Sequence, residues 1–337
     1  MKRIISVIAT IVLAICALSG CGSAGSQAGS GSQSASGSQA PVSSKKISIV
    51  TTIFPEYDWV KNVLGDSSSN ADITLLLDKG VDLHSFQPTA RDIMKISSCD
   101  LFIYVGGESD DWVKDALKEA VNKNMVTVNL MDVLKDELKE EEIVEGMQSE
   151  GEEPEEEEPE YDEHIWLSLK NASKAVSAIS DALQKVDEAN KDTYKKNASE
   201  YVKKLNALDG EYKKAVEGAS IKTLLFGDRF PFRYLVDDYK LSYFAAFIGC
   251  SAETEASFET ISFLAKKTDE LSLHAVMTID GSDKKIAETI IKNTKAGDQK
   301  ILTLDSMQTT TSKESASGTT YLSIMEKNLS VLKEALK

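Results

Sequence analysis

The chain alternates between short runs of apolar, β-branched residues and longer segments in which apolar residues recur every three or four positions. This alternation is typical of βα units assembled on mainly parallel sheets. Four strands are expected in each half of the chain, which predicts an α/β fold with two similar lobes. The expected strands are 47–53, 73–77, 101–105 and 126–130, then 223–226, 243–247, 275–279 and 301–304.

A helical pattern without proline separates the two sets of strands. It covers 169–217 and is interrupted once, near 187–190. A helix of this length between two sheets is a stiff connector, unlike a glycine-rich hinge. The expected organisation is therefore a first lobe at 46–168, a helical bridge region at 169–217 and a second lobe at 218–337.

One segment of the first lobe, 139–163, is dominated by glutamate and carries Pro154 and Pro159. Like charges repel and apolar residues are few, so a mobile loop is expected. The loop is either a solvated surface or a device that gathers cations near a binding site. The second interpretation is favoured because the loop ends directly at His164.

The first 45 residues have the composition of a leader and a tether. Residues 1–21 carry Lys2 and Arg3, then an apolar run, and end in Leu-Ser-Gly-Cys, which resembles the bacterial lipobox. We expect Cys21 to be lipidated and to hold the protein on the extracytoplasmic face of the bacterial cytoplasmic membrane. The alternative is an ordinary signal peptide with a chance cysteine. Residues 22–45 are almost entirely Gly, Ser, Ala and Gln, which predicts a flexible tether.

The net charge and the cysteines limit which partners and which structural roles the chain can have. The formal net charge of -16 argues against a nucleic-acid partner, because phosphates demand a basic face, and it is compatible with cations as ligands. Beyond the leader only Cys99 and Cys250 remain, in different halves of the chain. A disulfide between them is not expected, and each is interpreted as a small buried hydrophobe.

The chain has three histidines. His84 follows the end of a predicted strand after a glycine-containing turn, and His164 ends the acidic segment just before the bridging helix. Ligands of open α/β sheets bind outside the carboxyl ends of strands, so His84 is well placed. His274 opens a predicted strand and lies at the wrong end of it, which favours a structural role.

The segments around the first two histidines resemble a known family. Residues 77–89 read LDKGVDLHSFQPT and residues 163–172 read EHIWLSLKNA. Both resemble the His motifs of the metal-binding solute-binding proteins of zinc and manganese ABC importers, the ZnuA/TroA-like family, and the resemblance continues through the second half. It implies two Rossmann-like lobes bridged by a long helix, with a metal site in the cleft between them. It also implies a monomeric, non-enzymatic protein that captures Zn²⁺ or Mn²⁺ and delivers it to an ABC transporter permease.

By the same resemblance, His84 and His164 are metal ligands from the first lobe. Asp305 matches the carboxylate that many members supply after the last strand of the second lobe, although a plain turn residue is the alternative. The family commonly supplies a third histidine from the first strand of the second lobe.

This chain departs from the family at that third position, where it reads LLFGDRFPF. Asp228 is the nearest substitute ligand, and an ion pair between Asp228 and Arg229 is the alternative. Other candidates that follow the next predicted strand rank below it: Cys250, Glu253 and Glu255.

The departure leaves the ion open. Two histidines with two carboxylates resemble a manganese-type arrangement, yet Zn²⁺ outcompetes Mn²⁺ at most nitrogen and oxygen sites. Three other functions fit parts of the pattern. A zinc hydrolase is disfavoured because the chain has no HExxH, G-x-S-x-G or Walker A motif. A binding protein for a metal chelate, of the siderophore or cobalamin type, and a metal-buffering surface lipoprotein or adhesin remain alternatives.

Overall fold

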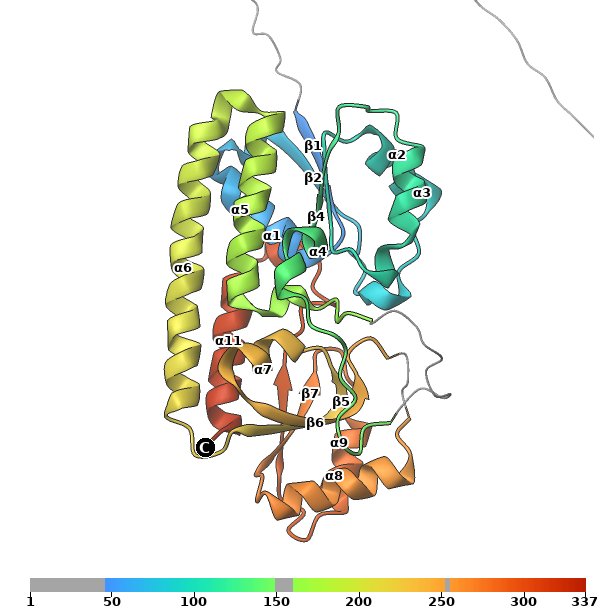
Figure 1. Ribbon diagram of the computed structural model, residues 1–337, viewed down its shortest axis with the longest axis vertical. Coiled ribbons are helices and arrows are strands. Elements are labelled where there is room, and N and C mark those ends of the chain that lie inside the picture. The colour runs from blue at the N-terminus through green and yellow to red at the C-terminus, as the bar shows by residue number, and fades with distance from the viewer. Residues whose placement is uncertain (1–45, 149–159, 252–254) are drawn as a thin grey trace, which may run out of the picture. The chain divides into compact units, whose positions relative to one another are not determined.

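The computed structural model describes residues 46–148, 160–251 and 255–337, and it contains two four-stranded parallel sheets flanked by helices (Figure 1). The predicted leader, the predicted tether and the middle of the acidic segment lie outside the described residues. The α/β class and the two lobes predicted from the sequence are confirmed. Among the described residues, no helix has the length and apolar character needed to cross a membrane.

The first lobe has strand order β2-β1-β3-β4, all parallel. Strands β1 and β3 lie in the middle of this sheet and are largely buried on both faces, as expected for a parallel sheet covered by helices. The elements are β1 Ile47–Thr51, α1 Phe54–Leu64, η1 Gly65–Asn70, β2 Ala71–Leu75, η2 Leu83–Ser85, α2 Ala90–Ser98, β3 Leu101–Tyr104, η3 Glu108–Asp110, α3 Trp112–Lys118, β4 Val126–Asn129, α4 Leu130–Val133 and η4 Lys135–Glu137.

The second lobe repeats this plan, with strand order β6-β5-β7-β8. Helices α8 and α9 cover one face and enclose a small apolar cluster with β5, β6 and β7. The elements are β5 Thr223–Phe230, α7 Arg233–Tyr239, β6 Ser242–Ile248, α8 Phe258–Glu270, β7 Ala275–Ile279, α9 Lys285–Lys292, β8 Lys300–Leu304, α10 Ser312–Ala316 and α11 Tyr321–Ala335.

The region between the lobes forms a helical hairpin rather than a single bridge. Helix η5 (Ile165–Leu167) leads into α5 (Leu169–Val186), and a turn at η6 (Glu188–Asn190) reverses the chain into α6 (Lys191–Glu217), so the predicted break is found where expected. Helix α6 packs against α5 and α1 of the first lobe and against α7 and α11 of the second (Figure 1). The long helix therefore connects the lobes while it contributes to the core of both.

The ends of the acidic segment are ordered, which corrects the expectation of a mobile loop for those parts. Residues 139–148 leave the first lobe and lie along the second, where the backbone N–H of Gln148 donates to the carbonyl of Ala246 at 3.0 Å. Glu142 pairs with Arg233 at 3.4 Å. The amide of Asp162 returns to the carbonyl of Lys139 at 2.9 Å. Partners from the second lobe therefore stabilise the first limb of the segment, residues 139–148. That limb in turn stabilises the other limb, residues 160–163.

The last part of the chain ties the second lobe back to the first. The backbone N–H of Tyr321 donates to the buried carboxylate of Asp58 at 3.1 Å, and the Tyr201 hydroxyl of α6 donates to the same oxygen at 3.3 Å. Lys61 of α1 donates to the hydroxyl of Ser315 at 3.0 Å. These bonds join α1 to α6, α10 and α11, which restricts how far the lobes can separate.

A second buried carboxylate, Glu56, shapes the loop that follows β1. Its side chain is fully buried and accepts hydrogen bonds from the amides of Thr52 (2.8 Å) and Ile53 (3.3 Å), so it caps the start of α1. Burial, reinforced by the nearby carboxylate of Asp110, raises the pKa of Glu56 from 4.5 to about 8. Glu56 is therefore neutral in the folded protein at neutral pH.

This raised pKa predicts a dependence of stability on pH. The folded state holds the Glu56 proton more tightly than the unfolded state, so the free energy of unfolding falls as pH rises from about 4.5 to about 8. Glu56→Gln keeps the acceptor oxygen but cannot ionise. In urea unfolding we expect this variant to exceed the wild type by more than about 1 kcal/mol at pH 8.5 and to match it only near pH 4, below the unfolded pKa of 4.5.

The control is Glu211→Gln, at an exposed position of α6, which should leave the pH dependence of unfolding unchanged. Equal slopes of stability against pH for Glu56→Gln and the wild type would contradict the assignment.

Candidate metal centre

His84 lies in η2, beyond the carboxyl end of β2, as the sequence predicted. The carboxylate of Asp82 caps this short helix and accepts the backbone N–H of His84 at 3.0 Å. The outer ring nitrogen, Nδ1, lies 2.7 Å from the Ser109 hydroxyl and 3.4 Å from the Glu163 carboxylate. These partners hold the ring so that Nε2 is the nitrogen directed into the cleft.

His164 is fully buried and lies immediately before η5. Asp162 fixes it twice, because Oδ1 accepts the backbone N–H at 2.8 Å and lies 3.2 Å from Nδ1. The ring of Trp166 packs against the imidazole with the ring centres 5.2 Å apart, and the Trp166 indole donates to the carbonyl of Ser306 at 2.9 Å. The local turn and a contact with the second lobe together determine where this imidazole lies.

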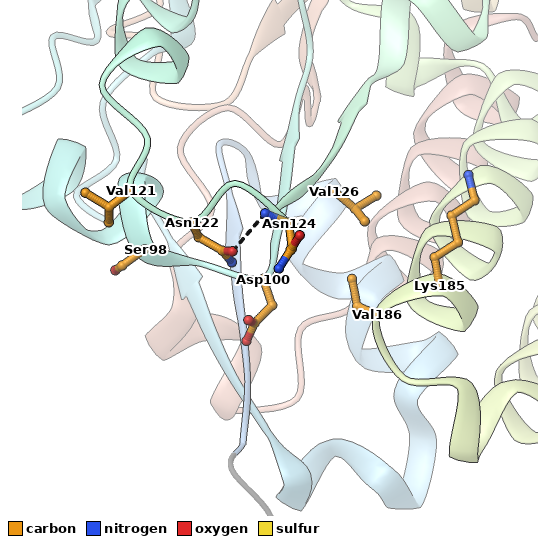
Figure 2. A pocket seen from close by; sticks show the side chains of 8 residues that line it. All are labelled: Ser98, Asp100, Val121, Asn122, Asn124, Val126, Lys185 and Val186. Atoms are coloured by element: carbon orange, nitrogen blue, oxygen red, sulfur yellow. Dashed lines mark hydrogen bonds between the residues drawn. The ribbon is translucent and has the colours of Figure 1, made fainter.

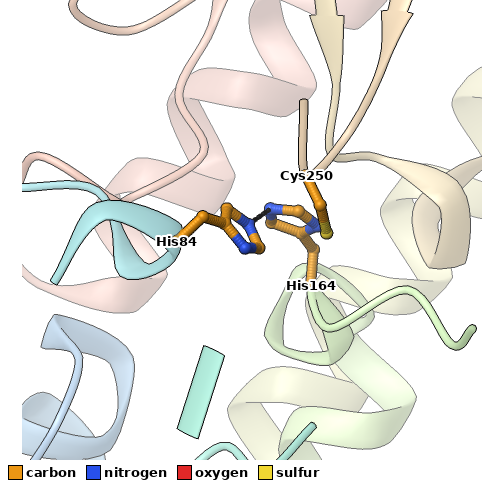
Figure 3. A group of neighbouring side chains, drawn as sticks. All are labelled: His84, His164 and Cys250. Atoms are coloured by element: carbon orange, nitrogen blue, oxygen red, sulfur yellow. Dashed lines mark hydrogen bonds between the residues drawn. The ribbon is translucent and has the colours of Figure 1, made fainter. Parts of the chain in front are cut away.

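The two imidazoles meet at their inner nitrogens. Nε2 of His84 lies 3.2 Å from Nε2 of His164, although the residues are 80 positions apart in sequence (Figure 3). With Nδ1 of each ring held by a carboxylate or hydroxyl, both Nε2 lone pairs can be directed to one point. An outer partner on Nδ1 and a free Nε2 is the usual arrangement of histidines that bind metal ions.

Cys250 is the third member of this cluster. It follows β6, and its sulfur and one nitrogen of each imidazole lie within 4.8 Å of one another (Figure 3). Gly249 allows the close approach, because a Cβ there would lie 3.0 Å from Cε1 of His164. Sequence reasoning ranked Cys250 below Asp228, although its place after a predicted strand was the signal that could have raised it.

Asp228 lies outside this cluster. A register shift between Phe226 and Arg229 interrupts β5 at this point and redirects both charged side chains. The Asp228 carboxylate accepts the N–H groups of Arg229 (2.9 Å) and Ile279 (3.3 Å). The alternative considered from sequence was an ion pair between Asp228 and the Arg229 guanidinium. In the structure the guanidinium contacts Asp82 instead. A role for Asp228 as a metal ligand stays a prediction.

Asp305 also has local partners. It follows β8, its Oδ1 accepts the N–H of Met307 at 2.8 Å, and its backbone is bonded on both sides to the Asn328 amide. Burial, with the neighbouring Asp280 carboxylate, raises the pKa of Asp305 to about 6. Its role as a ligand likewise stays a prediction. His274 lies away from the cluster, with Nε2 2.8 Å from the carbonyl of Glu334 in α11.

An ion pair joins the lobes beside the histidines. Arg229 of β5 contacts Asp82 of the first lobe at 2.7 Å, and its other terminal nitrogen donates to the carbonyl of Ser251 at 3.2 Å. Both charged side chains are mostly buried, with 21% and 18% exposed. The pair therefore places a permanent positive charge close to His84 and partly neutralises the Asp82 carboxylate.

The two histidines have opposite acid–base behaviour. Burial lowers the pKa of His84 to about 3, reinforced by the positive charges of a protonated His164 and of Arg229. Burial also acts to lower the pKa of His164, but the adjacent Asp162 carboxylate outweighs it and the pKa is raised. A neutral His84 beside a more basic His164 is the expected state at neutral pH.

Two cavities differ in their relation to this cluster. A cavity of about 530 Å³ opens at the amino ends of β3 and β4, the opposite end of that sheet from His84 (Figure 2). No histidine or cysteine lines it: its residues are Ser98, Asp100, Val121, Asn122, Asn124, Val126, Lys185 and Val186. A second cavity, of about 450 Å³, lies between the lobes beside the cluster and includes Ser85 and Ser251 in its wall. The second cavity is therefore bounded by the residues that directly follow His84 and Cys250 in the chain.

Comparison with known proteins agrees with this geometry. Residues 49–335 match the family model described as the zinc-uptake complex component A, periplasmic, ZnuA. The chain belongs to the ZnuA family. Members of this family are solute-binding proteins of transport systems, and the match covers nearly all of the two lobes.

Two curated relatives in this family are named for zinc. The chain is 31% identical over 291 residues to the high-affinity zinc uptake system protein ZnuA of Bacillus subtilis, covering 86% of this chain and 88% of that protein. It is 29% identical over 294 residues to the zinc-binding protein AdcA of Streptococcus pyogenes, covering 86% of this chain and 56% of AdcA. The chain thus spans about half the length of the AdcA relatives that it matches.

Solved structures of the family share the fold. The Zn(II)-bound ZnuA-like domain of Streptococcus pneumoniae AdcA superposes with a TM-score of 0.68 at 28% identity, covering 86% of this chain and 99% of that one. The metal-dependent lipoprotein YcdH of Bacillus subtilis gives a TM-score of 0.69 at 27% identity, covering 87% of this chain and 100% of that one.

The opposite pKa shifts can be checked in the metal-free protein by nitrogen NMR of the imidazoles. We expect His84 to stay neutral between about pH 4 and pH 8. His164 should titrate with a pKa above its ordinary value of 6.5. Asp162→Asn should lower the pKa of His164, because burial is then opposed only by the Asp82 and Glu163 carboxylates. Asp111→Asn, at an exposed site of the first lobe, is the control. Simultaneous titration of both rings near pH 6.5 would contradict this description.

Proposed function

We propose that this protein captures Zn²⁺ between its two lobes and delivers the ion to the permease of an ABC importer. The observation that carries the proposal is the pair of Nε2 atoms, 3.2 Å apart, on two imidazoles whose outer nitrogens are already held. Two nitrogens bound to one tetrahedral Zn²⁺ at about 2.0–2.1 Å lie about 3.3 Å apart. The pair therefore has the spacing that one shared ion requires.

The cleft beside the pair favours a bare cation over an organic chelate. Its walls include four carboxylates and one guanidinium: Asp82, Asp228, Asp280, Asp283 and Arg229. A cleft lined mainly by negative charge concentrates cations and repels the anionic groups typical of iron chelators. Titration with the bare ion separates the two cases, since a chelate-binding protein would not hold the ion alone.

Zinc is favoured over manganese because two imidazoles supply the best-defined donors, and because the relatives named above are zinc proteins. Asp228 and Asp305 are kept as proposed additional ligands that approach when the lobes close on the ion. Such carboxylates would move the site toward Mn²⁺, so Mn²⁺ is the second candidate ion.

Attachment to the membrane through Cys21 fits this function. A relative from Streptococcus pneumoniae, 32% identical over 289 residues, is named zinc-binding lipoprotein AdcA. A lipid anchor with a flexible tether would let a monomer meet its permease repeatedly.

The laminin-binding protein Lmb of Streptococcus agalactiae, 25% identical with a TM-score of 0.68, is described as a bifunctional protein with adhesin and metal-transporting activity.

The central test is calorimetric titration of chelator-stripped protein with Zn²⁺ and then Mn²⁺. We expect one tight site per chain in the wild type and its loss in the double variant His84→Ala, His164→Ala, because both Nε2 donors are gone. His274→Gln is the matched control and should bind as the wild type does. Tight one-to-one binding that survives in the double variant would rule out the cleft and direct attention to the acidic segment.

The anchor is tested by Cys21→Ser in the intact precursor. Without the cysteine no lipid can be attached, so we expect the protein to move from the membrane fraction to the soluble fraction and to lose incorporation of labelled palmitate. A variant that stays in the membrane fraction would show that another feature attaches the chain.

A further inference from the structure

We infer that Cys250, as a thiolate, is the third protein ligand of the site, which makes it a His₂Cys centre selective for Zn²⁺ over Mn²⁺. The inference rests on the proposed function and adds to it the donor from the second lobe and the reason for selectivity.

The geometry requires the Cys250 sulfur to move toward the point that the two Nε2 atoms share. The sulfur and a nitrogen of each imidazole already lie within 4.8 Å of one another. Around one Zn²⁺ with Zn–N of about 2.0–2.1 Å and Zn–S of about 2.3 Å, nitrogen and sulfur lie about 3.6 Å apart. A change of χ1 rotamer moves a cysteine sulfur by about 3 Å, which is the kind of movement that would bring it toward the two Nε2 atoms. Figure 3 shows the sulfur beside the His164 ring, opposite the side that meets His84.

At the strand where a histidine was expected, the described residues of the second lobe include no donor that is already grouped with the two histidines. Arg229 carries a permanent positive charge and is bound to Asp82 and to the carbonyl of Ser251. The Asp228 carboxylate accepts two backbone N–H groups. Within the part of the chain that the structure describes, Cys250 is the second-lobe side chain grouped with the two histidines.

The environment of the thiol keeps it protonated until an ion binds, because burial and the Glu141 and Asp162 carboxylates raise the pKa of Cys250, so the metal ion has to displace the proton. Glu141 hydrogen-bonds to both the side chain and the backbone of Cys250, and its Oε1 is buried without a hydrogen-bond partner. Cys250 also forms no disulfide. Glu141 lies on the ordered limb of the acidic segment, so that limb holds a carboxylate against the cysteine.

Coordination replaces the S–H bond by a metal–sulfur bond, and the proton leaves to the buffer. No oxidant or reductant is involved. The soft thiolate favours Zn²⁺ and Cd²⁺, whereas Mn²⁺ prefers oxygen donors. Cys250 is therefore the residue expected to separate the two ions that the histidines alone would both accept.

The experiment compares wild type with Cys250→Ser, Cys250→Ala and Cys99→Ala, the last being a buried free cysteine that belongs to no metal-binding group among the described residues. The full chain is purified in detergent and stripped of metal. Co²⁺ serves as a spectroscopic probe, since thiolate coordination adds an intense charge-transfer band in the near ultraviolet. Zn²⁺ and Mn²⁺ affinities are measured by competition against a chelator.

We expect the band in the wild type and in Cys99→Ala, and its loss in both Cys250 variants. Zn²⁺ affinity of the Cys250 variants should fall by more than the about 10- to 100-fold that loss of an outer-shell partner costs, while Mn²⁺ affinity changes little. The wild-type spectrum decides the question even if a Cys250 variant fails to fold, because absence of the band in the wild type overturns the inference.

The double variant His84→Ala, His164→Ala distinguishes the two levels of failure. If it abolishes tight Zn²⁺ binding while Cys250→Ser binds as the wild type does, the proposed function stands and the cysteine ligand is wrong. If tight Zn²⁺ binding survives in the double variant, the proposed function fails and the inference fails with it.

Discussion

The whole site depends on how the outer nitrogens of two imidazoles are held. Nδ1 of His84 lies against Ser109 and Glu163, and Nδ1 of His164 lies against Asp162. Without these partners the rings could rotate, and nothing would keep their inner nitrogens 3.2 Å apart. Asp162 and Glu163 directly precede His164 in the chain, so one short turn orients one ring and supports the other. This is why the ordered end of the acidic segment matters more to the site than its charge.

Much of this arrangement could be read from the sequence. The eight strands and the break between the two bridging helices follow from the local pattern. The assignment of the two histidines to one site follows from the resemblance of their flanking segments to the family. What the sequence does not contain is which surfaces of the two lobes meet. Cys250 comes close to His164 because Gly249 lets β6 approach it, and that contact exists only once the lobes are packed.

The misjudged parts have the same physical origin. The limbs of the acidic segment looked mobile because their own composition cannot form a core, yet Arg233 and the backbone of β6 supply partners from the other lobe. The partner of Arg229 was equally hidden. An irregularity in β5 turns the Arg229 guanidinium toward Asp82, 147 positions away, whereas the partner considered from sequence, as the alternative to a metal-ligand role, was the adjacent Asp228.

The ties between the lobes have a consequence for timing. Helix α6, the bonds from Tyr321 to Asp58 and from Lys61 to Ser315, and the ion pair from Arg229 to Asp82 all join the halves of the molecule. Wide opening would have to break several of them together. For the ion capture proposed above, this means that a bound ion would leave spontaneously only on a slow timescale. Under that proposal, the residence time of the ion would be set by a docking partner that competes for these same contacts rather than by the protein alone.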